Sequence, residues 1–430
     1  MLRVASSILL LAACVGPDSG HVVDACTDCG PGDLVLGRFV SADWRVYFGA
    51  SVDGVTARTL DDHLAWLGPD LAVDREVPIA SPLHGAMKMR GPVVGPSGDV
   101  VTDSRWHDRF FEYSVLQVYA VDGKLRFEHD IGRSRVAATA VGPSQIFVVA
   151  DTSANVPIEG QDFAAGSLIA LDRLTGHVTW SLTIPGGVVV DIAAMPDGGV
   201  AMHGSFVGTL ALGGTAPVLQ ALDPPTESSF LGALDAAGRG RWALRTDVPD
   251  PDLNGVRHIA AGPHGEVGFV AEWVDQEPIP FAIGDVAIAP AQKDSGLWAG
   301  RAIGVVDATG ALSWLRPLGW TGVDVIFSLA TDGTEVIIAG NYRVYPLPFG
   351  ASPTPDEDDG FIGAVDATGV RWVQTASGLG SQRCTVLALT ADRVVVSINS
   401  FRQREDDAAT LSYGSVHEPG EGVVIGELAR

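Results

Sequence analysis

The sequence predicts an all-β fold, a seven-bladed β-propeller of four-stranded antiparallel blades. Two kinds of short hairpin alternate along the chain, and turn-forming residues are frequent. The 430 residues include 52 glycines and 26 prolines, while 46% are hydrophobic. Such a composition supplies a core interrupted by many turns, and no stretch longer than a turn or two shows helical periodicity. A repeat of short strands is therefore favoured over a helical domain.

The first kind of hairpin is a recurring phrase: an apolar strand, an aspartate, a turn glycine and then an aromatic residue. Because an aspartate carboxylate accepts backbone N–H groups inside a turn and glycine adopts positive φ, each copy predicts two antiparallel strands. The aromatic ring is expected to fill core space between sheets, with a ligand cage as the alternative. The copies are Asp172–Gly176–Trp180, Asp235–Gly238–Trp242, Asp307–Gly310–Trp314 and Asp366–Gly369–Trp372, with a weaker one at Asp122–Gly123–Phe127.

The second kind of hairpin lies between these copies and turns at glycine or proline. Its turns fall at Asp53-Gly54, Gly95–Gly98, Gly142-Pro143, Pro196–Gly198, Gly262–Gly265, Thr331–Gly333 and Ala391-Asp392. Alternation of the two hairpins is typical of propeller blades. The expected blades are residues 44–80, 86–130, 135–185, 188–246, 256–318, 323–377 and 384–428.

The two ends of the chain are expected to share one blade. The last unit stops at Leu428 after what corresponds to a third strand, while a spare strand, Leu34 to Val40, precedes the first blade. Pairing the spare strand with the last unit closes the ring and removes two exposed sheet edges.

The charge balance and the motifs limit the function classes. With 28 basic and 52 acidic residues the net charge is -24, which disfavours nucleic acid or anionic lipid as an electrostatic partner. There is no Gly-x-Ser-x-Gly elbow, no His-Glu-x-x-His and no Walker loop, and His258 and His264 are separated by a strand and its turn, which predicts structural roles. We therefore expect a binding or scaffolding module. The alternative is an envelope enzyme with its active site at the channel mouth, of the quinone-dependent dehydrogenase or polysaccharide lyase type.

The amino-terminal segment carries an export signal. Residues 1–13 place Arg3 before a ten-residue apolar stretch, which is too short to span a bilayer. Leu11-Ala12-Ala13-Cys14 resembles the lipobox of bacterial lipoproteins, which implies that Cys14 is acylated, with palmitate as a label, and anchors the mature chain to a membrane. Residues 14–33 would be a flexible tether to a propeller domain of residues 34–430. Val15 after the cysteine implies an outer-membrane address, facing either the periplasm or the cell surface; the alternative is an ordinary secretory signal.

The fourth predicted blade carries a family resemblance. Gly204-Ser-Phe-Val-Gly-Thr209, followed by a loop and Phe230-Leu-Gly-Ala-Leu-Asp235, resembles the repeat of bacterial seven-bladed propeller proteins. Echoes occur as Phe281-Ala-Ile-Gly284, Pro348-Phe-Gly350 and Ser412-Tyr-Gly414. The resemblance implies a fold and little chemistry, since propellers host unrelated activities.

Three cysteines follow Cys14. A disulfide within Cys26–Cys29, or from one of them to Cys384, is expected in an exported protein, and half of a zinc or redox site is the alternative. The acidic runs Asp356-Glu357-Asp358-Asp359 and Glu405-Asp406-Asp407 are expected to be solvated loops, with calcium binding as the alternative. No other metal or cofactor is predicted.

The connections between second and third strands are long, at residues 151–166, 208–228, 274–300, 343–359 and 401–421. Long loops gathered on one face of a rigid scaffold often bind ligands. We therefore expect a protein or glycan ligand on this face, with neutral insertions as the alternative.

Overall fold

The fold was taken from a computed structural model in which every described regular element is a strand. The described residues are 21–430 except 24–33, 41–46, 51–55, 61–62, 69–70, 80–85, 90–91, 108–111, 133, 152–154, 223–226, 248–254, 293–295, 319–322, 343–358, 378–380, 391–392, 402–409, 414–415 and 420–421. Among these residues, no helix is long and apolar enough to cross a membrane.

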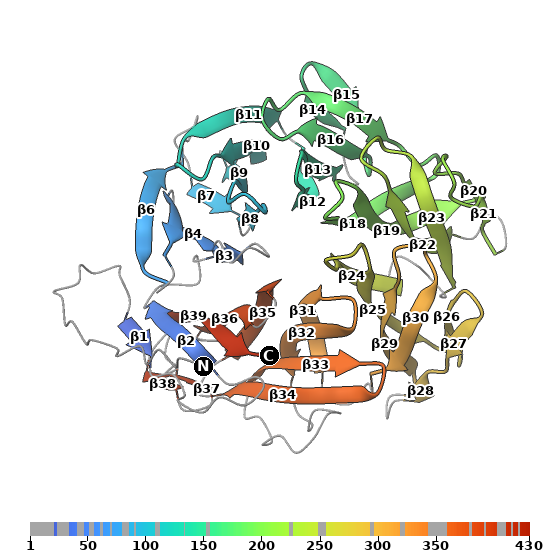
Figure 1. Ribbon diagram of the computed structural model, residues 1–430. Coiled ribbons are helices and arrows are strands. Elements are labelled where there is room, and N and C mark those ends of the chain that lie inside the picture. Colours follow the sequence, from blue (N-terminus) through green and yellow to red (C-terminus); the bar gives the residue numbers. More distant parts are fainter. Residues whose placement is uncertain are drawn as a thin grey trace, which may run out of the picture.

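Antiparallel sheets follow one another along the chain and surround a central axis (Figure 1). The described residues form seven sheets of four or more strands, which we number as blades in chain order. Blade 1 contains β3 (Tyr47–Ala50), β4 (Thr56–Leu60), β5 (His63–Leu67) and β6 (Val73–Pro78). Blade 2 contains β7 (Ala86–Met89), β8 (Val93–Val94), β9 (Val100–His107), β10 (Glu112–Tyr119) and β11 (Leu125–Gly132). Blade 3 contains β12 (Val136–Val141), β13 (Gln145–Ala150), β16 (Leu168–Asp172) and β17 (Val178–Leu182).

The remaining blades repeat this arrangement. Blade 4 contains β18 (Gly187–Ala194), β19 (Val200–Val207), β22 (Glu227–Leu234) and β23 (Gly240–Asp247). Blade 5 contains β24 (Gly255–Ala261), β25 (Val267–Asp275), β28 (Ala291–Gln292), β29 (Trp298–Val306) and β30 (Leu312–Pro317). Blade 6 contains β31 (Val323–Thr331), β32 (Glu335–Tyr342), β33 (Asp359–Asp366) and β34 (Gly369–Ser377). Blade 7 contains β35 (Ser381–Leu389), β36 (Arg393–Phe401) and β39 (Gly422–Ala429). The all-β propeller with four-stranded antiparallel blades is confirmed.

The two ends of the chain meet in blade 7. Strand β2 (Leu34–Val40) pairs antiparallel with β39, with Leu34 opposite Leu428 and Val40 opposite Val423. The predicted closing strand thus has the predicted bounds. A further strand, β1 (His21–Val23), pairs with the outer edge of β2. The expectation that residues 14–33 are a flexible tether is therefore wrong for residues 21–23, which cover the edge that β2 would otherwise expose.

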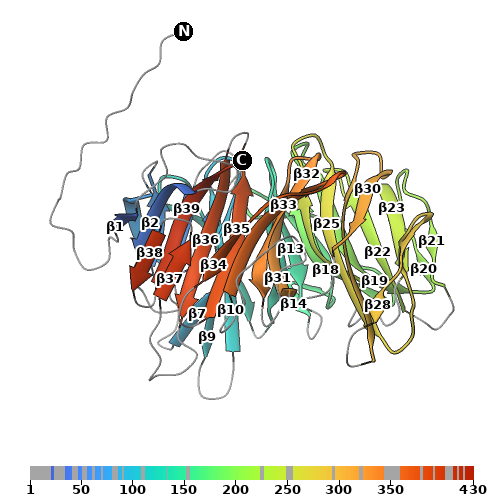
Figure 2. The ribbon, with the colours of Figure 1, turned by 90° about the horizontal axis from the view of Figure 1, so that it is seen from below.

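The core lies between neighbouring sheets, which stand side by side around the axis (Figure 2). The recurring aspartates form the predicted turns: Asp172 Oδ1 accepts the backbone N–H of Thr175 at 2.8 Å and also its hydroxyl at 2.8 Å. These hydrogen bonds stabilise the carboxylate, so they hold the pKa of Asp172 below its usual range. Asp235, Asp307 and Asp366 accept equivalent turn N–H groups.

The aromatic residue of each phrase contacts the following blade. Trp180 on β17 lies over Gly238 in blade 4, so close that a Cβ on that glycine would be 2.7 Å from the indole. Trp242 lies over Gly310 of blade 5 in the same way, and Phe127 lies over Gly176 of blade 3. The phrases at Asp172 and Asp235 thus supply both a turn glycine for the preceding ring and a ring for the next glycine, which predicts mutual dependence among blades 2 to 5. A Cβ on Gly369 would meet no atom within 4 Å.

Hydrogen bonds also join neighbouring blades close to these contacts between rings and turn glycines. In each case a side chain on the fourth strand of one blade donates to a turn carbonyl of the next blade, although the donor residue differs. The four donor and acceptor pairs are Arg75 with Val121 O, His129 with Gly176 O, Trp180 with Ala236 O and Arg316 with Ala367 O.

Candidate functional site

Only one predicted disulfide cysteine lies among the described residues. Cys384 on β35 is a free thiol in the core between blades 6 and 7, and burial, followed by the Asp359 carboxylate, raises its pKa. Cys384 forms no disulfide among the described residues, and its pairing with Cys26 or Cys29 stays a prediction. Cys14, Cys26 and Cys29 lie outside the described residues, and the lipid anchor and a Cys26–Cys29 disulfide stay predictions.

The predicted calcium loop is only partly described. Asp359 is not a loop residue: it begins β33, is 3% exposed and accepts a long hydrogen bond of 3.5 Å from the Tyr342 hydroxyl. Asp356, Glu357, Asp358 and the run Glu405–Asp407 lie outside the described residues. Among the residues that the structure describes, no group of three or more His, Cys, Asp or Glu side chains could hold a metal ion. Calcium binding stays a prediction.

The tryptophans of the recurring phrase lie in the core as expected. Trp242 is buried, while Trp180, Trp314 and Trp372 are half-buried and pack against buried clusters. Core packing therefore accounts for their positions.

The long connections take a different form from the predicted loop face. Four of the five contain hairpins of their own: β14 (Val156–Ile158) with β15 (Gln161–Phe163), β20 (Thr209–Leu210) with β21 (Leu219–Gln220), β26 (Phe281–Ile283) with β27 (Val286–Ile288), and β37 (Thr410–Tyr413) with β38 (Val416–Pro419). Of the fifth, residues 343–358 lie outside the described residues. These hairpins lie at the outer rim of the ring (Figure 1). The expectation of open loops gathered over one face is therefore wrong for these segments.

Two of the hairpins extend the preceding blade. Strand β26 comes from blade 5 but pairs with β23 of blade 4, with Thr246 opposite Ile283. Strand β37 comes from blade 7 and pairs with β34 of blade 6, with Ala376 opposite Tyr413. Phe281 and Tyr413, which belong to the echoed sequence motif, are buried where the hairpins attach. The motif therefore specifies a hairpin that joins two blades.

Exposed aliphatic side chains concentrate in the connections of blades 4 and 5. We call this set the apolar rim; it comprises Val207, Val218, Leu222, Ile279, Val286 and Leu297. The two connections are neighbours, because β23 contacts β21 and also pairs with β26. The sequence did not single out these residues, since exposure of an aliphatic residue depends on which side of its strand meets another sheet.

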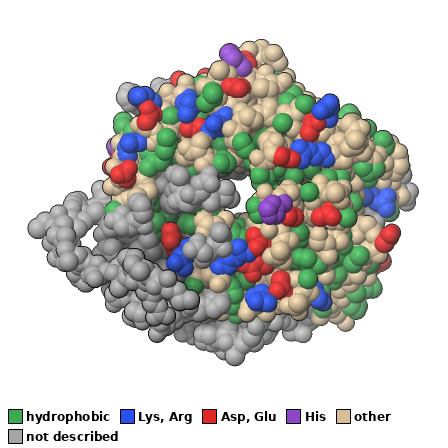
Figure 3. Space-filling view, viewed as in Figure 1, with side chains coloured by type: hydrophobic (Ala, Val, Ile, Leu, Met, Phe, Trp, Pro, Cys, Tyr) green, Lys and Arg blue, Asp and Glu red, His purple; other side chains and the backbone are tan. Residues whose placement is uncertain are grey.

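The inner strands surround a hollow at the centre of the ring (Figure 3). Five of these inner strands carry a β-bulge, in which two successive residues lie opposite one residue of the neighbouring strand. The extra residues are Ala137, Val190, Arg257, Phe327 and Leu387. At this level the Arg383 guanidinium lies over the Phe327 ring, 4.2 Å from its centre. Bulges increase twist and redirect side chains, so these positions shape the wall of the hollow.

A row of buried polar groups crosses blade 5. The Arg301 Nε lies 2.7 Å from the Glu272 carboxylate on the adjacent strand, and Arg301 is buried. His258 Nε2 donates to the backbone carbonyl of Ile326 in blade 6 at 2.8 Å, so this histidine joins two blades as a structural group. His203 of blade 4 is also buried, and burial, followed by the nearby His258, lowers its pKa to about 3.

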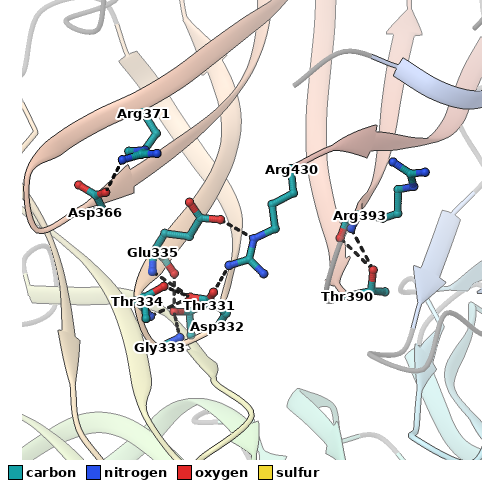
Figure 4. Close-up of polar contacts among 10 residues, drawn as sticks. All are labelled: Thr331, Asp332, Gly333, Thr334, Glu335, Asp366, Arg371, Thr390, Arg393 and Arg430. Atoms are coloured by element: carbon teal, nitrogen blue, oxygen red, sulfur yellow. Dashed lines mark hydrogen bonds and ion pairs between the residues drawn. The ribbon is translucent and has the colours of Figure 1, made fainter. Parts of the chain in front are cut away.

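The residue after β39 ties blade 7 to blade 6 (Figure 4). Arg430 Nε donates to the Glu335 carboxylate at 2.6 Å, and its guanidinium also contacts Asp332. Asp332 in turn accepts the backbone N–H groups of Thr334 and Glu335. Burial raises the pKa of Glu335. The cluster is an interblade contact rather than an open acid–base site.

Comparison with known proteins identifies no family for this chain. No known protein family and no curated protein matches the sequence. Among solved structures, a chain of the hydrazine synthase of Kuenenia stuttgartiensis is 12% identical with a TM-score of 0.44, and the match covers 76% of this chain and 78% of that one. The carboxy-terminal WD40 domain of Sif2 is 9% identical with a TM-score of 0.43, covering 93% and 99%. A chain of the mitotic checkpoint complex is 12% identical with a TM-score of 0.45, covering 99% of both. The assignment as a β-propeller rests on the sheet order and register described above.

Proposed function

We propose that this chain is a lipid-anchored protein of a bacterial cell envelope, carried on the outer membrane, and that its ring of blades binds a protein partner through the apolar rim. The single observation that carries the binding proposal is the concentration of exposed aliphatic side chains in the adjacent connections of blades 4 and 5. Apolar side chains gathered on a soluble surface commonly mark an interaction site.

The chemistry of the apolar rim favours a protein over a glycan or a lipid surface. Its members are valine, leucine and isoleucine, which gain by burial against other apolar groups and offer no hydrogen bonds to sugar hydroxyls. A chain of net charge -24 is repelled by anionic lipid headgroups. A partner with a complementary apolar patch remains as the ligand that this surface fits best.

The position of the anchor supports this arrangement. The seven residues from Cys14 to Gly20 precede β1, so a lipid on Cys14 would hold blade 7 within about 25 Å of the bilayer. Strands β1 and β2 lie across the ring from β20, β21, β26 and β27 (Figure 1). An anchor at Cys14 therefore leaves the apolar rim on the far side of the ring from its attachment.

The anchor is tested by Cys14→Ala in the full chain. We expect the variant to leave the membrane fraction and to lose palmitate labelling, because the acylated sulfur is missing. Cys26→Ala is the control and should keep both properties. Retention of label and membrane association by Cys14→Ala would exclude the lipoprotein assignment.

The binding surface is tested with two leucines of similar exposure. Leu222 in the apolar rim is 55% exposed, and Leu174 in a blade 3 turn is 58% exposed. Partners are captured from solubilised envelopes, identified by mass spectrometry and compared between variants. We expect Leu222→Asp to lose a stoichiometric partner that Leu174→Asp retains. Equal retention or equal loss in both variants would contradict binding through the apolar rim.

A further inference from the structure

A cavity lies at the inner edges of blades 2, 3 and 4. Its volume is about 200 Å³, large enough for a small organic molecule. The lining residues come from β8, β9, β12 and β18 and are Val93, Val101, Asp103, Ala137, Ala138, Thr139 and Asp191. The cavity lies at the inner edges of the blades and shares no residue with the apolar rim, which lies in the connections of blades 4 and 5.

Small side chains at the bulge of β12 create this space. The bulge residue of blade 3 is Ala137, followed by Ala138. The corresponding bulge residues of the next blades are Val190, Arg257 and Phe327, whose side chains are all larger. Alanine at this bulge occupies less volume than valine, arginine or phenylalanine does in the other blades. Because closely packed sheets relax only partly, the neighbouring strands do not fill the space.

Two carboxylates from different blades line the cavity. Asp103 on β9 is only 5% exposed, so water screens its charge little. Asp191 on β18 accepts the backbone N–H of Ile192 through Oδ1 at 2.9 Å. Both aspartates make further interactions, but a carboxylate offers about four lone-pair sites and can accept an additional donor. The Thr139 hydroxyl is a further polar group, and the described lining residues include no lysine, arginine or histidine.

We propose that this cavity binds a small alkyldiammonium compound, with one ammonium group at Asp103, the other at Asp191 and the carbon chain against the apolar wall. Ammonium N–H groups donate charge-assisted hydrogen bonds to carboxylates. The methyl groups of Val93, Val101, Ala137 and Ala138 provide an apolar contact that a hydrated metal ion would not use. The donor set also lacks a third carboxylate, histidine or cysteine within the described residues.

The test is calorimetric titration of the mature chain with 1,4-diaminobutane, butan-1-ol and calcium chloride in parallel. We expect heat from the diamine alone. Asp103→Asn and Asp191→Asn should each weaken binding at least about tenfold, because a charged hydrogen bond contributes roughly 1.5–3 kcal/mol. Asp162→Asn, on the exposed hairpin strand β15, is the matched control and should bind as the wild type does.

A substitution that fills the cavity separates occupancy from folding. Ala138→Leu adds volume to the lining without removing a charge, and we expect it to abolish the diamine signal while Ala237→Leu, at an exposed turn, retains it. Circular dichroism and capture of the rim partner confirm that each variant is folded. Absence of diamine binding to the wild type, equal binding of butan-1-ol, or binding of calcium in place of the diamine would each overturn the proposal. Such a result would leave the apolar rim untouched, because the two sites share no residue.

Discussion

At the scale of single residues, the blades are joined by rings that lie on glycines. Gly238 has a φ of +76°, which favours glycine, and the indole of Trp180 occupies the space where a side chain would begin. Gly208 has a similar φ of +74°, but a Cβ on that glycine would meet no atom within 4 Å. The two glycines thus have similar φ, but a ring lies over Gly238 alone.

Replacement of Gly238 by alanine should therefore cost more than the same change at Gly208. We expect Gly208→Ala to lower the free energy of unfolding by about 1 kcal/mol through backbone strain alone. Gly238→Ala should lose a further 1–3 kcal/mol, roughly, because the indole must move. Urea unfolding followed by tryptophan fluorescence measures both values. Equal losses would contradict the contact between Trp180 and blade 4.

The burial of His203 predicts that the free energy of unfolding depends on pH. Its pKa in the folded protein is about 3, below the usual 6.5, because burial and His258 disfavour the charged ring. The unfolded chain then binds more protons than the folded one, so stability present above pH 6.5 is lost as the pH falls towards 3. The slope from this group is about 1.4 kcal/mol per pH unit.

The comparison of wild type with His203→Gln isolates this contribution. Thermal unfolding across the acid range should show a shallower loss of stability in the variant, which carries no titrating ring. Parallel curves for the two proteins would show that His203 is protonated in the folded state over that range.

At the scale of elements, the hairpins β26–β27 and β37–β38 join neighbouring blades. Phe281 on β26 is fully buried and stacks on Trp273 of its own blade with ring centres 5.4 Å apart, which holds the hairpin where β26 pairs with β23 of blade 4. The outer strand β23 gains a partner at one end, so less of its edge is open to another chain.

Truncation of this attachment should be costly. We expect Phe281→Ala to reduce the free energy of unfolding by about 3–5 kcal/mol, the usual range for a buried phenylalanine. Val286→Ala on the exposed partner strand should stay within about 0.5 kcal/mol of the wild type. Chemical denaturation supplies both numbers, and a small effect of Phe281→Ala would show that the hairpin is not needed for the stability of blade 4.

At the scale of the whole molecule, closure depends on pairing of the two ends. Strand β2 completes blade 7 through its ladder with β39, and Arg430 joins the same blade to blade 6. Loss of β2 would expose the edge of β39 to another chain.

Two truncations distinguish closure from the anchor. A chain lacking residues 1–20 keeps β1 and β2 and should unfold cooperatively at the temperature of the mature protein. A chain lacking residues 1–40 loses β2 and should show a broadened, lower transition and a tendency to aggregate. Scanning calorimetry and light scattering measure these properties. Similar melting of both chains would mean that the ring does not depend on this closure.

The sequence by itself determined the repeat, the blade boundaries and the closing strand Leu34–Val40, because these depend on local turn chemistry and on alternation within short strands. The aspartate turns and the core tryptophans were predictable for the same reason. The attachment of β26 to β23, the buried position of Asp359, the apolar rim and the cavity beside Ala137 were not. Each of these depends on contacts between segments far apart in the chain, and the spacing of residues along one strand carries no information on which neighbouring sheet its side chains meet.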